Sequence, residues 1–242
     1  MYNNLVEYLP ILFLTLVSSF FGTATGFGTS TIMVPVLAIW FPLPEVLLFV
    51  GVIHWFGDVW KIFLFKIGAN WRLILLFGLP GLVASYFGAS IPLAVDSTIL
   101  KKVLAVFLII YTLHILIKPK WQIAKSTGEA VTGGVLSGFL AGLLGVGGVV
   151  RGAFLEAYKL PKSTYIFTSG MIAIFIDTPR LVRYYLGDIR LSEFSYTSLV
   201  LAVVVSFIGA ELAKKFVDKT PQAKFRYVVG FGLLVVSGFL LG

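Results

Sequence analysis

Apolar segments of about 20 residues follow one another along almost the whole chain, separated by short polar or basic stretches. The first half has a long apolar segment interrupted by glycines, at 9–40, and then uninterrupted segments at 44–65, 73–91 and 99–117. The second half repeats this order, with an interrupted segment at 129–158 and further segments at 164–186, 191–213 and 225–241. A helix of about 20 apolar residues is long enough to cross a bilayer core of about 30 Å. The pattern therefore predicts an all-α membrane protein.

The two halves also share individual residues at a fixed spacing. Seven positions recur 119 residues later with the same amino acid: Phe20, Gly26, Gly28, Pro42, Gly51, Asp58 and Gly68 return as Phe139, Gly145, Gly147, Pro161, Gly170, Asp177 and Gly187. We interpret the chain as an internal duplication within a single membrane transport domain (1–242). Its parts are repeat one (1–117), a linker (118–127) and repeat two (128–242).

Each interrupted segment either crosses the membrane once or turns back as a re-entrant hairpin, and loop charges favour the second arrangement. With Arg151 left aside as intramembrane, single crossings place nine Lys and Arg residues on each side, whereas turning back places thirteen on one side and five on the other. Cytoplasmic loops are usually the basic ones. We therefore predict two inverted repeats, each an interrupted (re-entrant or broken) helix plus three transmembrane helices. We expect a multi-pass protein of the cell membrane, that is, the plasma or inner membrane, with both termini on the outer side.

Composition narrows the possible functions. With 58% hydrophobic and 12% charged residues and a mean hydropathy of +0.98, the chain is too apolar for a water-soluble globule. The net charge of +8 is spread over short loops, which argues against nucleic-acid binding. The chain has no P-loop motif, and no spacing indicates a nucleophile with its base. We expect no enzyme activity and no cofactor; the expected partners are membrane lipid, a small anion and a coupling ion.

The two glycine-rich breaks are the strongest candidates for a binding site. Non-helical backbone inside a bilayer persists only where it is buried in protein or lines a watery cavity, and a helix that restarts there offers free N–H groups to an anion. Packing between helices is the alternative use of such glycines. The substrate-binding candidates in the two breaks are Gly26, Gly28, Thr29, Ser30, Thr31, Gly145, Gly147 and Gly148.

Three polar residues near the second break extend this prediction. Arg151 follows the break within one helical turn, and a charge at that depth needs an acid or a bound anion. We rank Arg151 first among the ligand candidates, with a structural salt bridge to Glu156 or Asp177 as the alternative. Thr168 and Ser169 are further substrate-binding candidates, although hydrogen bonding between helices is the commoner use of such residues.

Asp58 and Asp177 occupy equivalent positions, and a base follows each of them by three residues, Lys61 and Arg180. These are either simple ion pairs, with bases that reach the membrane interfaces, or coupling sites that carry a proton or bind sodium. His54 lies one helical turn before Asp58 and could share its proton. A divalent metal cation permease using His54, Asp58 and Asp177 is the alternative function, and Arg151 argues against it because a fixed cation repels a metal ion. We expect no resident metal.

Several of these motifs together resemble the sulfite exporter TauE/SafE family, and the resemblance spans nearly the whole chain. They are the repeated Gly-x-Gly break, Pro42 and Pro161 after a short apolar half-helix, Thr168-Ser169, and the ending at 184–189. Two residues depart from the family pattern, Thr29 and Phe154. The resemblance implies a multi-pass transporter of sulfite, sulfoacetate or related organosulfur anions. Our prediction is a secondary transporter, an exporter of small oxyanions, that works by alternating access around a midplane site formed by the two breaks.

Overall fold

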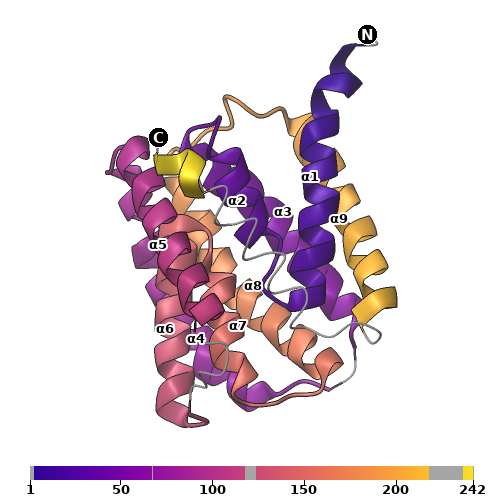
Figure 1. The fold of residues 1–242 in the computed structure, drawn as a ribbon, viewed down its shortest axis with the longest axis vertical. Helices are drawn as coiled ribbons and strands as arrows, with labels where there is room; N and C mark the ends of the chain where they lie inside the picture. The colour runs from indigo at the N-terminus through magenta and orange to yellow at the C-terminus, as the bar shows by residue number, and fades with distance from the viewer. Residues whose placement is uncertain (1–2, 67, 118–123, 218–236, 242) are drawn as a thin grey trace.

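The computed structural model describes residues 3–66, 68–117, 124–217 and 237–241, and these ranges contain helices and loops but no strand (Figure 1). The labelled helices are α1 (Asn3–Thr25), α2 (Ser30–Leu37), α3 (Leu43–Leu64), α4 (Trp71–Gly88), α5 (Ser97–Ile117), α6 (Thr127–Leu144), α7 (Gly147–Glu156), α8 (Lys162–Leu186) and α9 (Tyr196–Val217), with a 3-10 turn at Ile91–Leu93. Residues 237–241 are helical as well. Seven helices in the described part are long and apolar enough to cross a membrane; the short helices α2 and α7 are not among them. The predicted all-α membrane fold is confirmed.

The predicted segments correspond closely to these helices. The uninterrupted segments appear as α3, α4, α5, α8 and α9, and the two interrupted ones as the pairs α1–α2 and α6–α7. Local chemistry explains several starts: Pro42 and Pro161 precede α3 and α8, and the side chains of Asn70 and Ser126 cap α4 and α6 by accepting backbone N–H groups. Most of the predicted segment 225–241, and residues 118–123 of the predicted linker, lie outside the described residues.

In the first interrupted segment, α2 turns back along α1. The Thr15 hydroxyl contacts the Met33 sulfur at 3.7 Å, and the hydroxyls of Ser19 and Thr29 lie 3.3 Å apart. Residues later in α1 thus pair with residues earlier in α2, as in an antiparallel hairpin. The segment is a hairpin rather than one long broken helix.

The second interrupted segment folds in the same way. Near the break, the Ser137 hydroxyl donates to the Gly147 carbonyl at 2.9 Å. Farther away, a Cβ on Gly133 would lie 2.6 Å from the Phe154 ring. Hence α7 runs back along α6, and both interrupted segments turn back, which is the arrangement that the loop charges favour.

Helices of one repeat pack mainly against helices of the other repeat. Helix α1 packs on α9 at one side of the molecule and α4 packs on α6 at the other, while α3 meets α8 and α2 meets α7 in the middle (Figure 1). Since α1 to α4 of repeat one correspond to α6 to α9 of repeat two, exchanging the repeats maps this set of contacts onto itself. The orientation of the repeats in a membrane stays a prediction.

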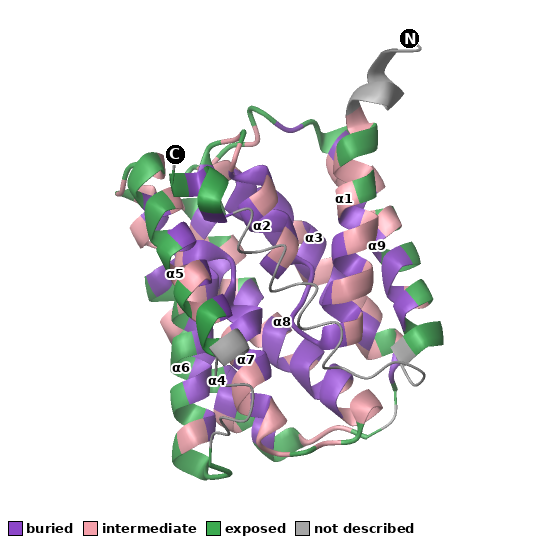
Figure 2. Cartoon of the chain, in the orientation of Figure 1, coloured by how far each residue is buried: buried purple, intermediate pink, exposed green. Residues whose placement is uncertain are grey.

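The central helices α3 and α8 run antiparallel. The Trp55 indole donates to the Thr178 hydroxyl at 3.0 Å. On one side of this contact Gly51 lies against Arg180, and on the other Gly170 lies against Lys61. Figure 2 shows buried residues concentrated on α2, α3 and α8, whereas α5 and α6 carry much of the exposed surface. Equivalent helices of the two repeats therefore form the centre of the fold.

Glycines bring α4 and α6 into backbone contact. A Cβ on Gly134 would lie 2.3 Å from the Phe77 carbonyl oxygen, and one on Gly138 would lie 2.1 Å from the Gly81 carbonyl oxygen. Packing is therefore the role of these glycines, as expected where small residues let membrane helices approach closely.

Candidate functional site

The two glycine breaks meet at the centre of the molecule. Gly26 and Gly145 follow the last residues of α1 and α6 in the left-handed conformation, with φ angles of 75° and 71°. Glycine adopts this conformation at no steric cost. A Cβ on Gly148 would lie only 1.6 Å from the Phe27 carbonyl oxygen, so the backbones of the two breaks are in direct contact. The structure thus brings together the candidates of both breaks.

Both short helices begin at this contact. Helix α2 begins at Ser30 and α7 at Gly147, and neither Thr29 nor Val146 caps its helix through a side chain. The first-turn N–H groups of an α-helix have no partner within the helix, and the helix dipole makes that end positive. Two positive helix ends therefore converge where the breaks touch, which suits a negatively charged group.

Most of the candidate hydroxyl groups already have protein partners. Thr29 lies 3.3 Å from the Ser19 hydroxyl, and the Thr31 hydroxyl donates to the Phe27 carbonyl at 3.3 Å. The Thr168 hydroxyl accepts the backbone N–H of Asn70 at 3.3 Å. Thr29 and Thr31 hold the first break in shape, and Thr168 ties α8 to the start of α4. Ser30 is buried as the first residue of α2.

Arg151 lies fully inside the protein, with 1% of its side chain exposed. Its Nε donates to the Ser169 hydroxyl at 3.0 Å, and that hydroxyl donates to the Gly26 carbonyl at 3.0 Å. One terminal guanidinium nitrogen has no hydrogen-bond partner, and the ion pairs found among the described residues include none from Arg151. Among the described residues, Asp177 pairs with Arg180 and His54 and not with Arg151, as the alternative would have had it.

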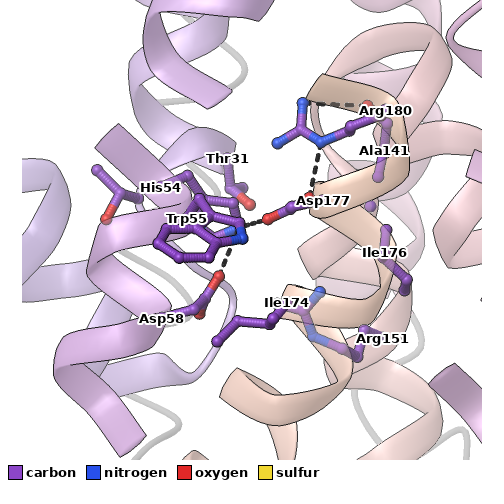
Figure 3. A network of polar contacts seen from close by, with 12 residues as sticks. Thr31, His54, Trp55, Asp58, Ala141, Arg151, Ile174, Ile176, Asp177 and Arg180 are labelled. Atoms are coloured by element: carbon purple, nitrogen blue, oxygen red, sulfur yellow. Dashed lines mark hydrogen bonds and ion pairs between the residues drawn. The ribbon is translucent and has the colours of Figure 1, made fainter. Parts of the chain in front are cut away.

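Beside Arg151, His54 lies between the two repeated acids (Figure 3). Its Nε2 is 3.4 Å from Oδ2 of Asp58 and 3.5 Å from Oδ2 of Asp177. The other oxygen of each carboxylate is held by its own base, Lys61 or Arg180, at 2.7 Å in both cases. The sequence thus correctly pairs each acid with the base three residues on, and the structure adds the bridge between the pairs.

The two bases, Lys61 and Arg180, lie inside the protein and do not extend to its surface. Lys61 is 0% exposed and Arg180 is 1% exposed. Each is kept inside by its carboxylate partner, and Arg180 also donates to the Ala141 carbonyl at 3.4 Å, in the last turn of α6. A cation at a helix C-terminus is favourable because the unpaired carbonyls there carry partial negative charge.

The acid cluster and the first break are in contact through His54. A Cβ on Gly28 would lie 2.1 Å from Cε1 of the His54 ring, so the imidazole rests directly on the backbone of the break. His54 Nδ1 is buried without a hydrogen-bond partner. A change of charge on His54 would therefore be felt at the break.

Sequence reasoning missed Tyr165. This residue is 6% exposed, and its ring packs on Gly26, where a Cβ would lie 2.3 Å from the ring. Its hydroxyl is buried without a hydrogen-bond partner. The available signal was its position four residues before Ser169, which places both on one face of α8.

Comparison with known proteins identifies similar sequences over nearly the full length. A family model described as "Sulfite exporter TauE/SafE" matches residues 11–240. The chain is also 25% identical, over 262 aligned residues, to a protein of Methanocaldococcus jannaschii described as a "Probable membrane transporter protein". That alignment covers 97% of this chain and 97% of its relative. Both descriptions concern transport.

Proposed function

Because the chain belongs to the sulfite exporter TauE/SafE family of membrane transporters, we propose that it is a secondary transporter that exports small oxyanions such as sulfite or organosulfonates. In this proposal the anion binds where the two glycine breaks touch, near the middle of the membrane. Transport proceeds by alternating access around that site.

The observation that carries this proposal is the unmatched positive charge of Arg151. The acids Asp58 and Asp177 are each paired with a base, Lys61 and Arg180, so the cluster contains two carboxylates and, with Arg151, three basic side chains. A buried charge without a counter-charge costs several kcal/mol. A bound oxyanion would supply both the missing charge and the acceptor for the unpaired guanidinium nitrogen.

The arrangement of the repeats supports alternating access. Antiparallel α3 and α8, together with two hairpins that turn back, are what inverted repeats with three crossings each would give. The positive-inside rule then places the loops at 118–127 and 157–161 in the cytoplasm and both termini outside, in a plasma or inner membrane.

The acid cluster is the proposed coupling site. At its centre, the Nε2 of His54 lies near one oxygen of each carboxylate, Asp58 Oδ2 and Asp177 Oδ2. A single proton on Nε2 can satisfy only one of these oxygens at a time, so the position of this proton biases one repeat against the other. This geometry favours a proton over sodium, because the imidazole of His54 fills the space between the two oxygens.

A divalent metal ion is the second candidate substrate, because three ligand atoms of His54, Asp58 and Asp177 lie within 4.8 Å of one another. The charges around them oppose it. Both carboxylates are already paired with buried cations, and Arg151 adds a further positive charge. A metal ion would raise the uncompensated buried charge from one to three, whereas a monovalent anion would bring it to zero.

Purified protein in liposomes tests the proposal. We expect uptake of labelled sulfite or sulfoacetate that depends on an imposed proton gradient and not on a sodium gradient; sulfate and oxalate measure selectivity. Arg151→Ala should abolish the flux while the protein still inserts and remains monodisperse, and Arg151→Lys should restore part of it. Full flux in Arg151→Ala, or uptake of Mn²⁺ in place of anions, would overturn the proposal.

A further inference from the structure

A small cavity of about 120 Å³ lies between the end of α7 and the start of α8. Its lining includes Lys159 and Lys162 toward the surface and Tyr165 on α8, together with the acid Glu156. Water in bulk occupies about 30 Å³ per molecule, so the space suits an ion of a few heavy atoms with some of its hydration. The cavity is outside the cluster of Arg151 and the paired acids.

Tyr165 stands between this cavity and the glycine breaks. Its ring lines the cavity and packs on Gly26 at the same time, and its hydroxyl lies 3.3 Å from where a Cβ of Gly152 would be. One turn farther along the same face of α8, Ser169 holds Arg151. Tyr165 and Ser169 therefore form successive polar positions from the cavity toward Arg151.

The Tyr165 hydroxyl is suited to meet a ligand. It is buried and has no hydrogen-bond partner among the described residues. A buried hydroxyl without a partner costs about 1–3 kcal/mol, so such groups are normally bonded to protein, water or a ligand. The hydroxyl lies against Gly152, the residue after Arg151, and its O–H can donate to an anion that approaches this arginine.

The mouth of the cavity carries net positive charge. Lys159 and Lys162 contribute two cations and Glu156 one anion. Low-dielectric walls focus the field of such charges and raise the local concentration of oppositely charged ions. Lys159 also has a left-handed backbone, with φ of 49°, in the turn that closes α7, so its position is set by that turn.

We propose that this cavity is an outer binding site for the transported oxyanion and that Tyr165 is the gate between the outer site and Arg151. The inference rests on the proposed function, which it deepens by naming the path. In this state the path leads to the face that carries Lys159 and Lys162. The Tyr165 hydroxyl donates to the anion as it leaves the cavity, and the ring closes the path behind Gly26 when no anion is present.

Flux kinetics test the gate. Tyr165→Phe keeps the ring and removes the donor, and it should lower the maximal rate of sulfite flux about tenfold or more, the usual effect of losing a hydrogen bond to a charged group. Lys159→Asn removes the charge and keeps a residue that tolerates a left-handed backbone, so it should raise KM a few-fold at an unchanged maximal rate. Tyr185→Phe is the matched control. Tyr185 lies on the same helix, but its side chain is 74% exposed and does not line the cavity.

Cysteine labelling tests the outer site without requiring transport. The chain contains no cysteine, so Lys159→Cys introduces a single thiol. Sulfoacetate should slow the labelling of this thiol by a charged methanethiosulfonate at least threefold, and gluconate should not; Lys215→Cys should label at the same rate with or without sulfoacetate. Equal labelling with and without sulfoacetate would overturn the outer site, and wild-type flux in Tyr165→Phe would overturn the gate. If the wild-type protein carries no anion at all, the proposed function fails, and the labelling experiment still decides whether the cavity binds anions.

Discussion

The two halves of the chain share an order of helices but differ in the side chains near the breaks. Four polar residues of repeat two lie on α7 and α8 near the breaks, and the positions 119 residues earlier are all apolar. Arg151, Tyr165, Thr168 and Ser169 correspond to Ile32, Val46, Phe49 and Val50. The three of these on α3 are 0% exposed and belong to a continuous apolar core with α2 and the end of α6.

Other features are alike in the two repeats. The glycines that end α1 and α6 have nearly the same φ, and each acid holds its base at 2.7 Å. These features of the helices and acid pairs recur in both repeats, whereas Arg151, Tyr165 and Ser169 have no polar counterpart in repeat one. The centre of the fold is therefore asymmetric: these three residues come from α7 and α8, and the corresponding positions of α2 and α3 are apolar.

The largest expected effect tests whether the acid pairs are equivalent. Asp58→Asn leaves Lys61 as a buried charge without a partner, and Asp177→Asn does the same to Arg180. Each should lower the free energy of unfolding by about 3–5 kcal/mol, as breaking one partner of a buried pair does. Denaturant titration of the purified protein in detergent measures this.

A double substitution provides the control for these variants. Asp58→Asn combined with Lys61→Met removes both charges and should recover most of the stability. It should not recover coupling to the proton gradient, because an amide in place of the Asp58 carboxylate can no longer bind a proton. Costs for the two single variants that differ by more than about 2 kcal/mol would show that the repeats are not equivalent frames.

The next effect concerns the contact between the breaks. Gly148→Ala places a Cβ against the Phe27 carbonyl oxygen, and backbone on both sides prevents easy relief. We expect a loss of about 3 kcal/mol, the upper end for overpacking, together with loss of transport. Gly128→Ala is the matched control: nothing crowds its Cβ closer than 3.9 Å, and in the first turn of α6 it should be neutral or slightly stabilising. Normal stability and flux in Gly148→Ala would mean that the breaks do not need to touch.

The sequence predicted the helices and their order better than the contacts among the central polar residues. Apolar segment length is a local signal, and it predicted the all-α membrane fold correctly. The two glycine-rich segments do interrupt helices, while their role as a binding site stays a prediction. Loop charge favoured the hairpins that the structure shows. Contacts between residues far apart in the chain were not accessible in this way: His54 between Asp58 and Asp177 depends on how α3 crosses α8.

The burial of Lys61 is a second feature that the sequence alone does not predict. Near the end of an apolar segment, a lysine is expected to extend to the interface, and only the packing of α8 against α3 shows that it is enclosed. Tyr165 was overlooked because its local signal, the position four residues before Ser169, does not show that its hydroxyl is buried without a partner. Its unpaired hydroxyl becomes visible only once the first break lies against its ring.

A reciprocal exchange between the repeats should have a moderate effect in one direction only. Ser169→Val gives repeat two the residue of repeat one and removes the hydrogen bonds to Arg151 and Gly26. Anion flux at low substrate concentration should fall about tenfold or more, since a hydrogen bond to a charged group contributes about 1.5–3 kcal/mol. Val50→Ser makes the opposite exchange on the apolar α2–α3 side and should change flux less than about twofold. Equal losses of flux in the two variants would show that the polar residues of repeat two have no special role in anion transport.

The smallest expected effect concerns what keeps the α2–α3 side closed. The Glu45 carboxylate, at the start of α3, accepts hydrogen bonds from the backbone N–H and hydroxyl of Ser192, at 2.9 and 2.6 Å, and from the N–H of Glu193 at 3.0 Å. It thereby fastens the α8–α9 loop over the apolar core. The equivalent residue in repeat two is Thr164, which has no carboxylate to accept a matching set of hydrogen bonds.

Glu45→Gln should therefore shift the population toward a state that is open on the α2–α3 side. The site is near the surface, so we expect a change of about 1 kcal/mol, or roughly a fivefold change in population. A thiol introduced by Leu43→Cys, at a position that is 0% exposed, reports this opening through its labelling rate with a charged reagent. Glu193→Gln removes the same charge from the same region but leaves the Glu45 carboxylate in place, and its labelling rate should match that of the parent. If Glu45→Gln also labels at the parent rate, hydrocarbon packing alone holds that side shut, and the difference between the two sides lies entirely in their cores.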